Sequence, residues 1–377
     1  MTADYFIGLD VHKRTIVTAI VDRDGKLLGG TTLKTSREEL FEWIEQWTGA
    51  GAAQIALEAS GSSAWVTYAL LGAGYEVTPV HPRHVRAIAE TKQKSDRLDA
   101  RKLAELLRLG ALRPVHIPSE ATRASRALVR QMRRLVCART RAKNAVTSVA
   151  AEHGFVCPWT DAFGKGGRKW LSNLALRPEY RTIVNQELEQ IDLLTRQVRL
   201  LERDLAAAAE TQPLYALART TPGVGPQLGA AIALEFGDMS RFKTAKAAAS
   251  YSGLIPATFQ SGEKRRGGGI TREGNSVLRW ALVQAVMQLV RLDPGAKQRY
   301  VRLRNRLKRY KARVAMARQL AVVLWHMART GEAYRRSEAP VKKPPAPSMA
   351  CRACSASVSV MPASTRKATV KKAVKHS

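Results

Sequence analysis

The chain has 377 residues and carries 62 Lys and Arg against 31 Asp and Glu, a formal net charge of +31. A protein this basic is expected to bind nucleic acid first and a membrane surface second. The sequence contains no run of about 18 apolar residues and no N-terminal secretion signal, so we expect neither a bilayer-spanning nor a secreted protein. At about 100–200 residues per domain, the length suggests two or three domains.

The positive charge is concentrated in parts of the chain. Residues 1–120 and 161–210 are neutral, whereas residues 121–160 carry a net +7, residues 211–337 a net +17 and residues 338–377 a net +7. A charge of +17 in one region exceeds what solubility requires. We therefore expect the neutral first third to hold a cluster of carboxylates and the basic regions to bind the polyanion.

The first 118 residues show alternating strand and helix patterns. Asp24-Gly25 is a strong hairpin signal, and Ser36 with Glu39 forms a capping box that opens a helix. Strands are predicted at residues 5–10, 15–21, 26–34, 54–57 and 75–80. Helices are predicted at residues 36–47, 62–71, 83–90 and 96–109. This order predicts an α/β domain at residues 1–118, with a mixed sheet and helices packed on it.

The remainder of the chain reads as mostly helical. Apolar residues at steps of 3 and 4 predict a helical hairpin or coiled coil over residues 119–212, with plain bundle helices as the alternative. Residues 213–336 form a compact, mostly α region, and Cys137 is expected to be a buried helix residue. Residues 337–377, rich in Pro, Ala, Ser and Lys, are expected to be a disordered basic tail.

Four carboxylates are placed where they can converge. Asp10 ends the first strand, Glu58 ends the fourth, and Asp96 and Asp99 are one helical turn apart. Such a group repels itself and needs a cation, and oxygen ligands suit Mg²⁺ or Mn²⁺. Two such ions would serve phosphodiester chemistry. For any one of these residues alone, a solvated charge or a helix cap is the alternative, and Asp96 beside Ser95 fits a cap.

Two features of the second half suggest phosphate contacts. Thr221-Pro222-Gly223-Val224-Gly225-Pro226 resembles a helix-hairpin-helix turn, in which Gly223 and Gly225 would let the backbone approach a phosphate. An ordinary loop between helices is the alternative. Nucleic-acid contacts are also expected from four cationic side chains, Lys264, Arg265, Arg266 and Arg279.

Ser261 begins a glycine-rich basic loop. The next cations and the run Gly267-Gly268-Gly269 suit holding a phosphate against a nucleophile. A serine hydroxyl needs a base or a metal to activate it, and nearby cations can neutralise a pentacovalent phosphate. From this chemistry alone, a phosphate-binding or structural serine remains the alternative. His12, two residues after Asp10, is interpreted as a strand-turn residue rather than a substrate contact.

The order of elements resembles the ribonuclease-H-like, RuvC-type nuclease fold, and the motifs resemble a narrower family. In the first half these are Gly8-Leu9-Asp10-Val11-His12-Lys13, Leu57-Glu58-Ala59-Ser60-Gly61 and Ser95-Asp96-Arg97-Leu98-Asp99-Ala100. In the second half they are Gly253-Leu254-Ile255-Pro256, Ser261-Gly262, Gly274-Asn275 and Leu278-Arg279. Together they are similar to the DEDD transposases of insertion-sequence family 110, including its 1111 subgroup, over roughly residues 5–330.

The resemblance implies a site-specific recombinase that cuts and rejoins DNA at donor and target sites, directed by a bridging guide RNA. It implies that Ser261 cuts DNA and leaves a phosphoserine link, and that Asp10, Glu58, Asp96 and Asp99 bind Mg²⁺ beside it. Strand exchange and resolution of a Holliday-type junction would follow. The two residue sets lie in different domains, so a composite site in a dimer or tetramer is expected. The expected location is cytoplasmic, on the bacterial nucleoid.

Two other functions remain open from the residues. A RuvC-like, metal-dependent Holliday-junction nuclease would need the carboxylates but not Ser261. A non-catalytic nucleic-acid-binding scaffold would need the basic regions and neither residue set. The co-occurrence of the four carboxylates with Ser261 in its basic segment favours the recombinase.

Overall fold

The computed structural model describes residues 3–49, 51–88, 95–261, 264–271 and 274–336. The chain divides into two units, Met1–Ser337 and Glu338–Ser377, and the description below concerns the first. The predicted tail, residues 337–377, lies outside the described residues.

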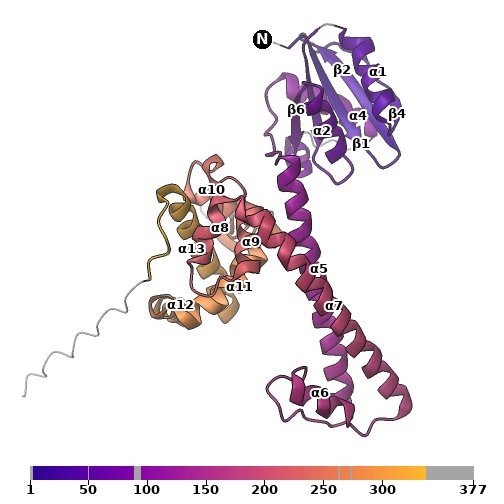
Figure 1. Ribbon diagram of the computed structural model, residues 1–377. Helices are drawn as coiled ribbons and strands as arrows, with labels where there is room; N and C mark the ends of the chain where they lie inside the picture. Colours follow the sequence, from indigo (N-terminus) through magenta and orange to yellow (C-terminus); the bar gives the residue numbers. More distant parts are fainter. Residues whose placement is uncertain (1–2, 50, 89–94, 262–263, 272–273, 337–377) are drawn as a thin grey trace, which may run out of the picture. The chain divides into compact units, whose positions relative to one another are not determined.

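The first part of the chain is a mixed sheet with helices on both faces, drawn in indigo and purple in Figure 1. The strands lie in the order β3-β2-β1-β5-β6, with β4 also paired to β2. β1 is antiparallel to β2 and parallel to β5, and β5 is parallel to β6. The strands are β1 (Tyr5–Val11), β2 (Thr15–Asp22), β3 (Leu27–Gly29), β4 (Thr32–Lys34), β5 (Ala53–Glu58) and β6 (Glu76–Val80).

Alternation along the strands assigns each face of the sheet to different helices. One face carries Ile7, Leu9 and the other members of an apolar cluster that α1 (Arg37–Thr48) and α2 (Ala64–Gly72) cover. On the other face α4 (Asp96–Arg108) packs through Leu103 and Leu107 against Ala56 and Val80. The mixed sheet and its helices are compatible with the expected ribonuclease-H-like domain.

Two predicted elements differ in the structure. The single strand expected over residues 26–34 is two short strands, β3 and β4, which both pair with β2 and are separated at Gly30-Thr31. The pairing of β2 with β3 contains a register shift between Ile20 and Val21. The chain passes close to β2 at Gly30, where a Cβ would lie 2.6 Å from the Thr18 carbonyl oxygen. The helix expected over residues 83–90 is α3 (Pro82–Ile88), and residues 89 and 90 lie outside the described part.

Two long helices follow the sheet and lie side by side (Figure 1). They are α5 (Glu120–Glu152) and α7 (Pro178–Glu210), joined through α6 (Lys165–Ser172). At the α6 end they share an apolar cluster that includes Val146, Leu171 and Ile191. Cys137 lies on α5 but is exposed. The expectation that it is buried is wrong because it faces away from the packed stripe that contains Val129 and Met132.

The C-terminal part is mostly helical and encloses the largest apolar cluster, built around Phe236, Leu282 and Leu320. An antiparallel hairpin of β7 (Pro256–Ser261) and β8 (Lys264–Ile270) interrupts the helices. Among the described residues, no helix is both long enough and apolar enough to cross a membrane. The helices are α8 (Pro213–Arg219), α9 (Pro226–Phe236), the short 3-10 helix η1 (Met239–Arg241), α10 (Ala245–Tyr251), α11 (Ser276–Leu292), α12 (Pro294–Arg306) and α13 (Arg309–Thr330).

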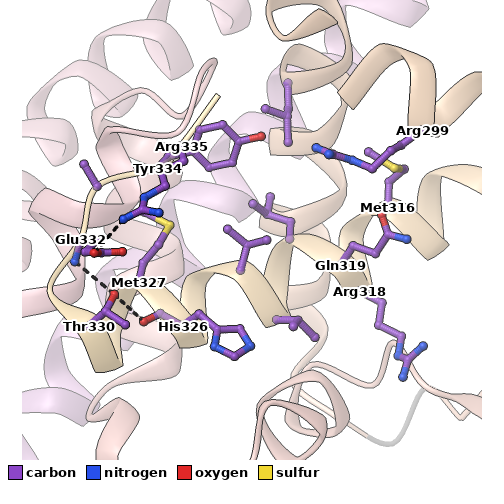
Figure 2. Close-up of a pocket in the computed structure, with 15 residues that line it drawn as sticks. Arg299, Met316, Arg318, Gln319, His326, Met327, Thr330, Glu332, Tyr334 and Arg335 are labelled. Carbon is purple, nitrogen blue, oxygen red and sulfur yellow. Dashed lines mark hydrogen bonds and ion pairs between the residues drawn. The ribbon is translucent and has the colours of Figure 1, made fainter. Parts of the chain in front are cut away.

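The segment after α13 folds back beside a cavity of about 590 Å³ (Figure 2). The Tyr334 hydroxyl donates a hydrogen bond of 2.8 Å to the carboxylate of buried Asp293, and the Tyr334 N–H donates to the Thr220 hydroxyl. Burial and this bond raise the pKa of Tyr334 to about 12. Burial also acts to raise the pKa of Asp293, but the donors around its carboxylate outweigh it and the pKa is lowered.

We predict that Tyr334→Phe destabilises the protein near neutral pH by about 1.5 kcal/mol, the lower end for a hydrogen bond to a charged group. A tyrosine whose pKa is raised on folding stabilises the protein below its unfolded pKa of 10.0, and this stabilisation is lost as pH rises toward about 12. Denaturant unfolding of both proteins should therefore give a difference that shrinks between about pH 9 and pH 12. Tyr310→Phe, at a side chain 60% exposed, is the control. A difference that stays constant over this range would contradict the assignment.

Candidate active site

Two of the predicted carboxylates lie at neighbouring strand ends. β1 and β5 are parallel with Leu9 opposite Leu57, so Asp10 and Glu58 occupy equivalent positions, each one residue further along. Both are partly buried, and Asp10 is 18% exposed. The Ser63 hydroxyl donates a 2.6 Å hydrogen bond to the Glu58 carbonyl oxygen, which fixes the end of β5. The parallel register therefore brings these two residues to one edge of the sheet.

Gly8 allows α4 to approach β1 closely. A Cβ at Gly8 would lie 1.9 Å from the Ala100 carbonyl oxygen and 2.7 Å from the Ala104 nitrogen, both backbone atoms of α4. The contact is lined by other small residues, since Ala100 and Ala19 belong to one buried cluster on this face. Side chains on a strand alternate, so Asp10 lies on the same face as Gly8. The approach of α4 therefore carries its first turn to Asp10.

The first turn of α4 supplies the other two carboxylates. Ser95 is the N-cap and its hydroxyl accepts a hydrogen bond from the Leu98 N–H. Ser95 therefore caps the helix, and the Asp96 carboxylate lies beside His12 instead. Asp99 lies one turn later, with Lys102 Nζ 3.7 Å from its carboxylate.

Asp10, Asp96 and His12 form a close group. His12 Nε2 lies 3.2 Å from Asp10 Oδ2 and 3.3 Å from Asp96 Oδ2. One donor atom from each residue lies within 4.8 Å of the others. Burial is the main cause that raises the pKa of Asp10; the carboxylates of Asp96 and Asp99 raise it further, and His12 opposes them. Asp10 is thus held where a negative charge is costly without a neighbouring cation.

This donor set fits a divalent cation. Three carboxylates share one region, and burial together with Asp96 and Asp99 raises the pKa of Asp10, so a bound cation would stabilise its charged form. Asp10 and Asp96 supply oxygen donors at mutual distances that one ion can span. Asp99 interacts electrostatically with Asp10. Glu58 lies beside Asp10 in the sheet but is not among the donor atoms grouped within 4.8 Å.

Ser261 is the last residue of β7. The backbone pairs it with Lys264, the first residue of β8, and pairs Gln260 with Arg265 and Phe259 with Arg266. The side chains of residues 257–268 lie outside the described part. The expectation of a glycine-rich loop is wrong for the backbone, because Gly267–Gly269 lie within β8 and Gly267 pairs with Thr258. Ser261 therefore lies beside the hairpin turn.

The base of this hairpin is fixed by close backbone contacts. Gly253 has φ +67°, and a Cβ at Gly274 would lie 2.2 Å from the Gly253 nitrogen. The Asn275 N–H donates to the Tyr251 carbonyl oxygen, and the Thr271 N–H donates to that of Ile255. The segments before and after the hairpin are therefore held together by backbone atoms.

A buried carboxylate, Glu235, contacts the segment that follows the hairpin. Glu235 on α9 is fully buried, and its carboxylate accepts a 2.6 Å hydrogen bond from the Asn275 amide. Arg130 Nε lies 3.4 Å from it, and buried Arg126 binds the Leu234 and Glu235 carbonyl oxygens. Asn275 also caps α11 by accepting from the Val277 and Leu278 N–H groups. Glu235 thereby ties α5 and α9 to the start of α11.

The other predicted nucleic-acid residues have identifiable structural surroundings. Gly223 has φ +85° and packs against Gln288 of α11, where a Cβ would lie 2.3 Å from the Gln288 Cβ. Gly225 is exposed at the start of α9, where Gln227 donates to the Glu202 carboxylate. Arg279 is partly buried and donates to the Ser252 carbonyl oxygen at the hairpin base. Gly223 and Arg279 therefore have packing roles within the chain.

Sequence reasoning missed two residues of this region. His12 does lie at the turn after β1, as interpreted, but that interpretation overlooked that its side chain also lies beside Asp10, two residues earlier. Glu235 is the one acid in the apolar helix 226–236, and that isolation was the available signal. Its partners come from α5 and from residue 275, and no local pattern shows them.

Comparison with known proteins adds independent information. A family described as Transposase, of the DEDD group of IS110, matches residues 7–153, and one described as Transposase IS116/IS110/IS902 family matches residues 215–301. A probable family 20 transposase of Pseudomonas aeruginosa is 25% identical over 87% of this chain and 98% of its own length. The transposase for insertion sequence element IS1111A of Coxiella burnetii is 24% identical over 87% of this chain and 91% of its own length.

The fold, the carboxylate group and these matches define a transposase, an enzyme class that cleaves and recombines DNA. The first match covers the sheet and the carboxylates, and the second covers most of the C-terminal helices and the hairpin with Ser261. The chain belongs to the IS110 family of transposases. A family of this DEDD type also indicates the use of a divalent metal.

We predict that Gly8→Ala lowers the free energy of unfolding by about 1–3 kcal/mol or more, because the added Cβ must push backbone atoms of α4 away. The displaced helix should also carry Asp96 from Asp10, so stabilisation of the protein by added Mg²⁺ or Mn²⁺ should disappear. Urea unfolding with and without the cation measures both effects. Gly72→Ala, at the end of α2 with open space around the added Cβ, is the matched control. A Gly8→Ala protein that unfolds like wild type would refute the role of this contact.

Proposed function

We propose that this transposase is a site-specific DNA recombinase that uses bound divalent cations and Ser261 as its nucleophile, under the direction of a bridging guide RNA. The observation that carries the proposal is the convergence of Asp10, Asp96 and Asp99 at the end of β1. The same chain also presents Ser261 next to a hairpin turn on a rigidly held base. A metal-dependent nuclease would need only the first of these features.

Asp10, Glu58, Asp96 and Asp99 are the residues that would hold Mg²⁺, with Mn²⁺ as a substitute. A bound ion of this kind stabilises the negative charge that develops on phosphate oxygens during strand cleavage. The chain's own contribution is to fix the donors before the ion arrives. The β1–β5 register fixes Asp10 and Glu58, and the Ser95 cap and the Gly8 contact fix the start of α4.

In the proposed cleavage, the Ser261 oxygen attacks a phosphorus atom of the DNA backbone and loses its proton. The new Oγ–P bond forms while one P–O bond to deoxyribose breaks, and the departing oxygen takes up a proton. The number of phosphodiester bonds is conserved, so rejoining needs no external energy source. Strand exchange and resolution of a Holliday-type junction would complete the reaction.

A groove on α5 is a suitable nucleic-acid surface. A cavity of about 570 Å³ is lined by four arginines of α5, Arg130, Arg133, Arg134 and Arg141. A second basic surface follows at α12 and α13, because residues 294–331 contain eleven Lys and Arg and no Asp or Glu. Arginine side chains in such numbers favour binding to phosphates. Lys264, Arg265 and Arg266 would add contacts near Ser261.

A composite assembly is part of the proposal. Ser261 and the carboxylates lie in different parts of the chain, separated by the long helices α5 and α7. We propose that a dimer or tetramer brings one protomer's serine to the carboxylates of its partner on DNA. Such an enzyme would work in the bacterial cytoplasm at the nucleoid.

Ser261→Ala should abolish both strand cleavage and a covalent protein–DNA adduct, since the attacking oxygen is removed. Labelled target DNA, supplied with guide RNA and Mg²⁺, is analysed by denaturing electrophoresis before and after protease treatment.

Asp10→Asn should also abolish cleavage but leave DNA binding nearly intact, because the basic surfaces remain.

Ser250→Ala is the control, because Ser250 is exposed near the end of α10 and should be dispensable. Ser252 is unsuited as a nucleophile, since it is buried and its hydroxyl donates to the Ala249 carbonyl oxygen. Cleavage at the wild-type rate by Ser261→Ala, without an adduct in either protein, would reject the covalent step and favour the nuclease.

Binding to duplex DNA should weaken steeply with salt, with a slope of about −0.9 in log K against log salt for each phosphate neutralised. The double variant Arg134→Glu/Arg141→Glu should bind less tightly and show a shallower slope, because both side chains line the α5 groove. Arg196→Glu/Arg199→Glu, which makes the same charge change on the exposed face of α7, should have a smaller effect. Equal losses in the two double variants would show that total charge, and not the groove, governs binding.

A further inference from the structure

The Nε2 atom of His12 points into the carboxylate group. This atom has essentially no exposed surface and no hydrogen-bond partner of acceptable direction among the described residues. Yet the nearest oxygens of Asp10 and Asp96 are only 3.2 and 3.3 Å away. The ring nitrogen and one oxygen of each aspartate are therefore grouped around one point, where a single cation could contact all three atoms.

The backbone holds His12 in this place. The His12 N–H donates a 2.9 Å hydrogen bond to the Thr15 carbonyl oxygen, which closes the turn between β1 and β2. The His12 carbonyl oxygen accepts from the Thr35 hydroxyl at 3.3 Å. Because both backbone groups are bound, the start of the imidazole side chain is fixed relative to Asp10. The His12 side chain as a whole is 44% exposed, so an ion can reach the group from solvent.

We propose that His12 Nε2 is a direct ligand of the divalent cation held by Asp10 and Asp96. This proposal rests on the cation site of the proposed function and adds a nitrogen donor to its carboxylates. One oxygen from each aspartate and the ring nitrogen already lie within 4.8 Å of one another, a span that a single ion can bridge. The site is then a mixed nitrogen and oxygen site.

A nitrogen ligand changes which metal the site prefers. Mg²⁺ takes oxygen ligands almost exclusively, whereas imidazole also binds transition metals. Among the divalent first-row transition metals, Mn²⁺ has the lowest affinity for such ligands. Mn²⁺ can therefore use His12 where Mg²⁺ gains little from it. His12 should set the ratio of Mn²⁺ to Mg²⁺ affinity, and its removal should lower Mn²⁺ affinity more than Mg²⁺ affinity.

The test measures cation binding directly on the full-length protein, without nucleic acid. Mn²⁺ binding is followed by electron paramagnetic resonance, and Mg²⁺ binding by its competition with Mn²⁺. His12→Gln should lower Mn²⁺ affinity by at least about tenfold, because even groups that only support metal ligands contribute 10–100-fold. Pulsed measurements on bound Mn²⁺ should detect a coordinated nitrogen in wild type and none in His12→Gln.

His326→Gln, at an exposed histidine on α13, is the matched control and should leave both signals unchanged. Circular dichroism melts check that each variant is folded. A coordinated nitrogen that persists in His12→Gln, or equal losses of Mn²⁺ and Mg²⁺ affinity, would overturn the proposal and leave His12 as a residue that only positions the carboxylates.

Asp10→Asn separates this inference from the proposed function. If wild type binds Mn²⁺, Asp10→Asn does not, and His12→Gln behaves as wild type, the carboxylate site stands and the histidine ligand is wrong. If wild type itself binds no divalent cation above the level of Asp10→Asn, the cation site and the histidine ligand both fail. If His12→Gln loses the nitrogen signal but keeps its Mg²⁺ affinity, both the carboxylate cation site and the histidine ligand are supported.

Discussion

The candidate site depends on one contact, the approach of α4 to β1 over Gly8. Only the absence of a side chain lets the α4 backbone reach the sheet, since a Cβ would overlap the Ala100 carbonyl oxygen. Asp10 is two residues further along the same strand face, and the approach brings Asp96 and Asp99 to it. The site is therefore assembled by packing between small residues, and its geometry and the stability of this face of the domain have the same origin.

The electrostatics of the site oppose its formation. Asp10 is partly buried beside two further carboxylates, and each of these raises the free energy of its charged form. The folded chain tolerates this arrangement because the buried sheet and its helices supply the stability. The imidazole of His12 lies 3.2 Å from the Asp10 carboxylate and opposes the rise in its pKa. A site built at the expense of stability in this way is typical of a metal-binding or catalytic role.

Local patterns predicted much of the fold, and long-range contacts decided the rest. The Asp24-Gly25 hairpin and the Ser36 cap were readable because each depends on neighbouring residues. The grouping of Asp10 and Asp96 was predictable from strand ends and helix spacing. The hairpin of β7 and β8 was missed because a glycine run has low strand propensity, and only its partner strand stabilises it. The domain boundaries and the role of Ser261 remain predictions.

The region around Ser261 depends on contacts between residues far apart in the sequence, which local patterns do not predict. Glu235 lies in an apolar helix and accepts from Asn275 and from the arginines of α5. Burying such a charge gains little stability, because desolvation offsets the attraction. What the contacts provide is a link between elements, since one carboxylate binds both Asn275 and Arg130. Arg130 lines the basic groove and Asn275 starts the helix after the hairpin. Glu235 therefore links the arginine-lined groove of α5 to the base of the serine hairpin.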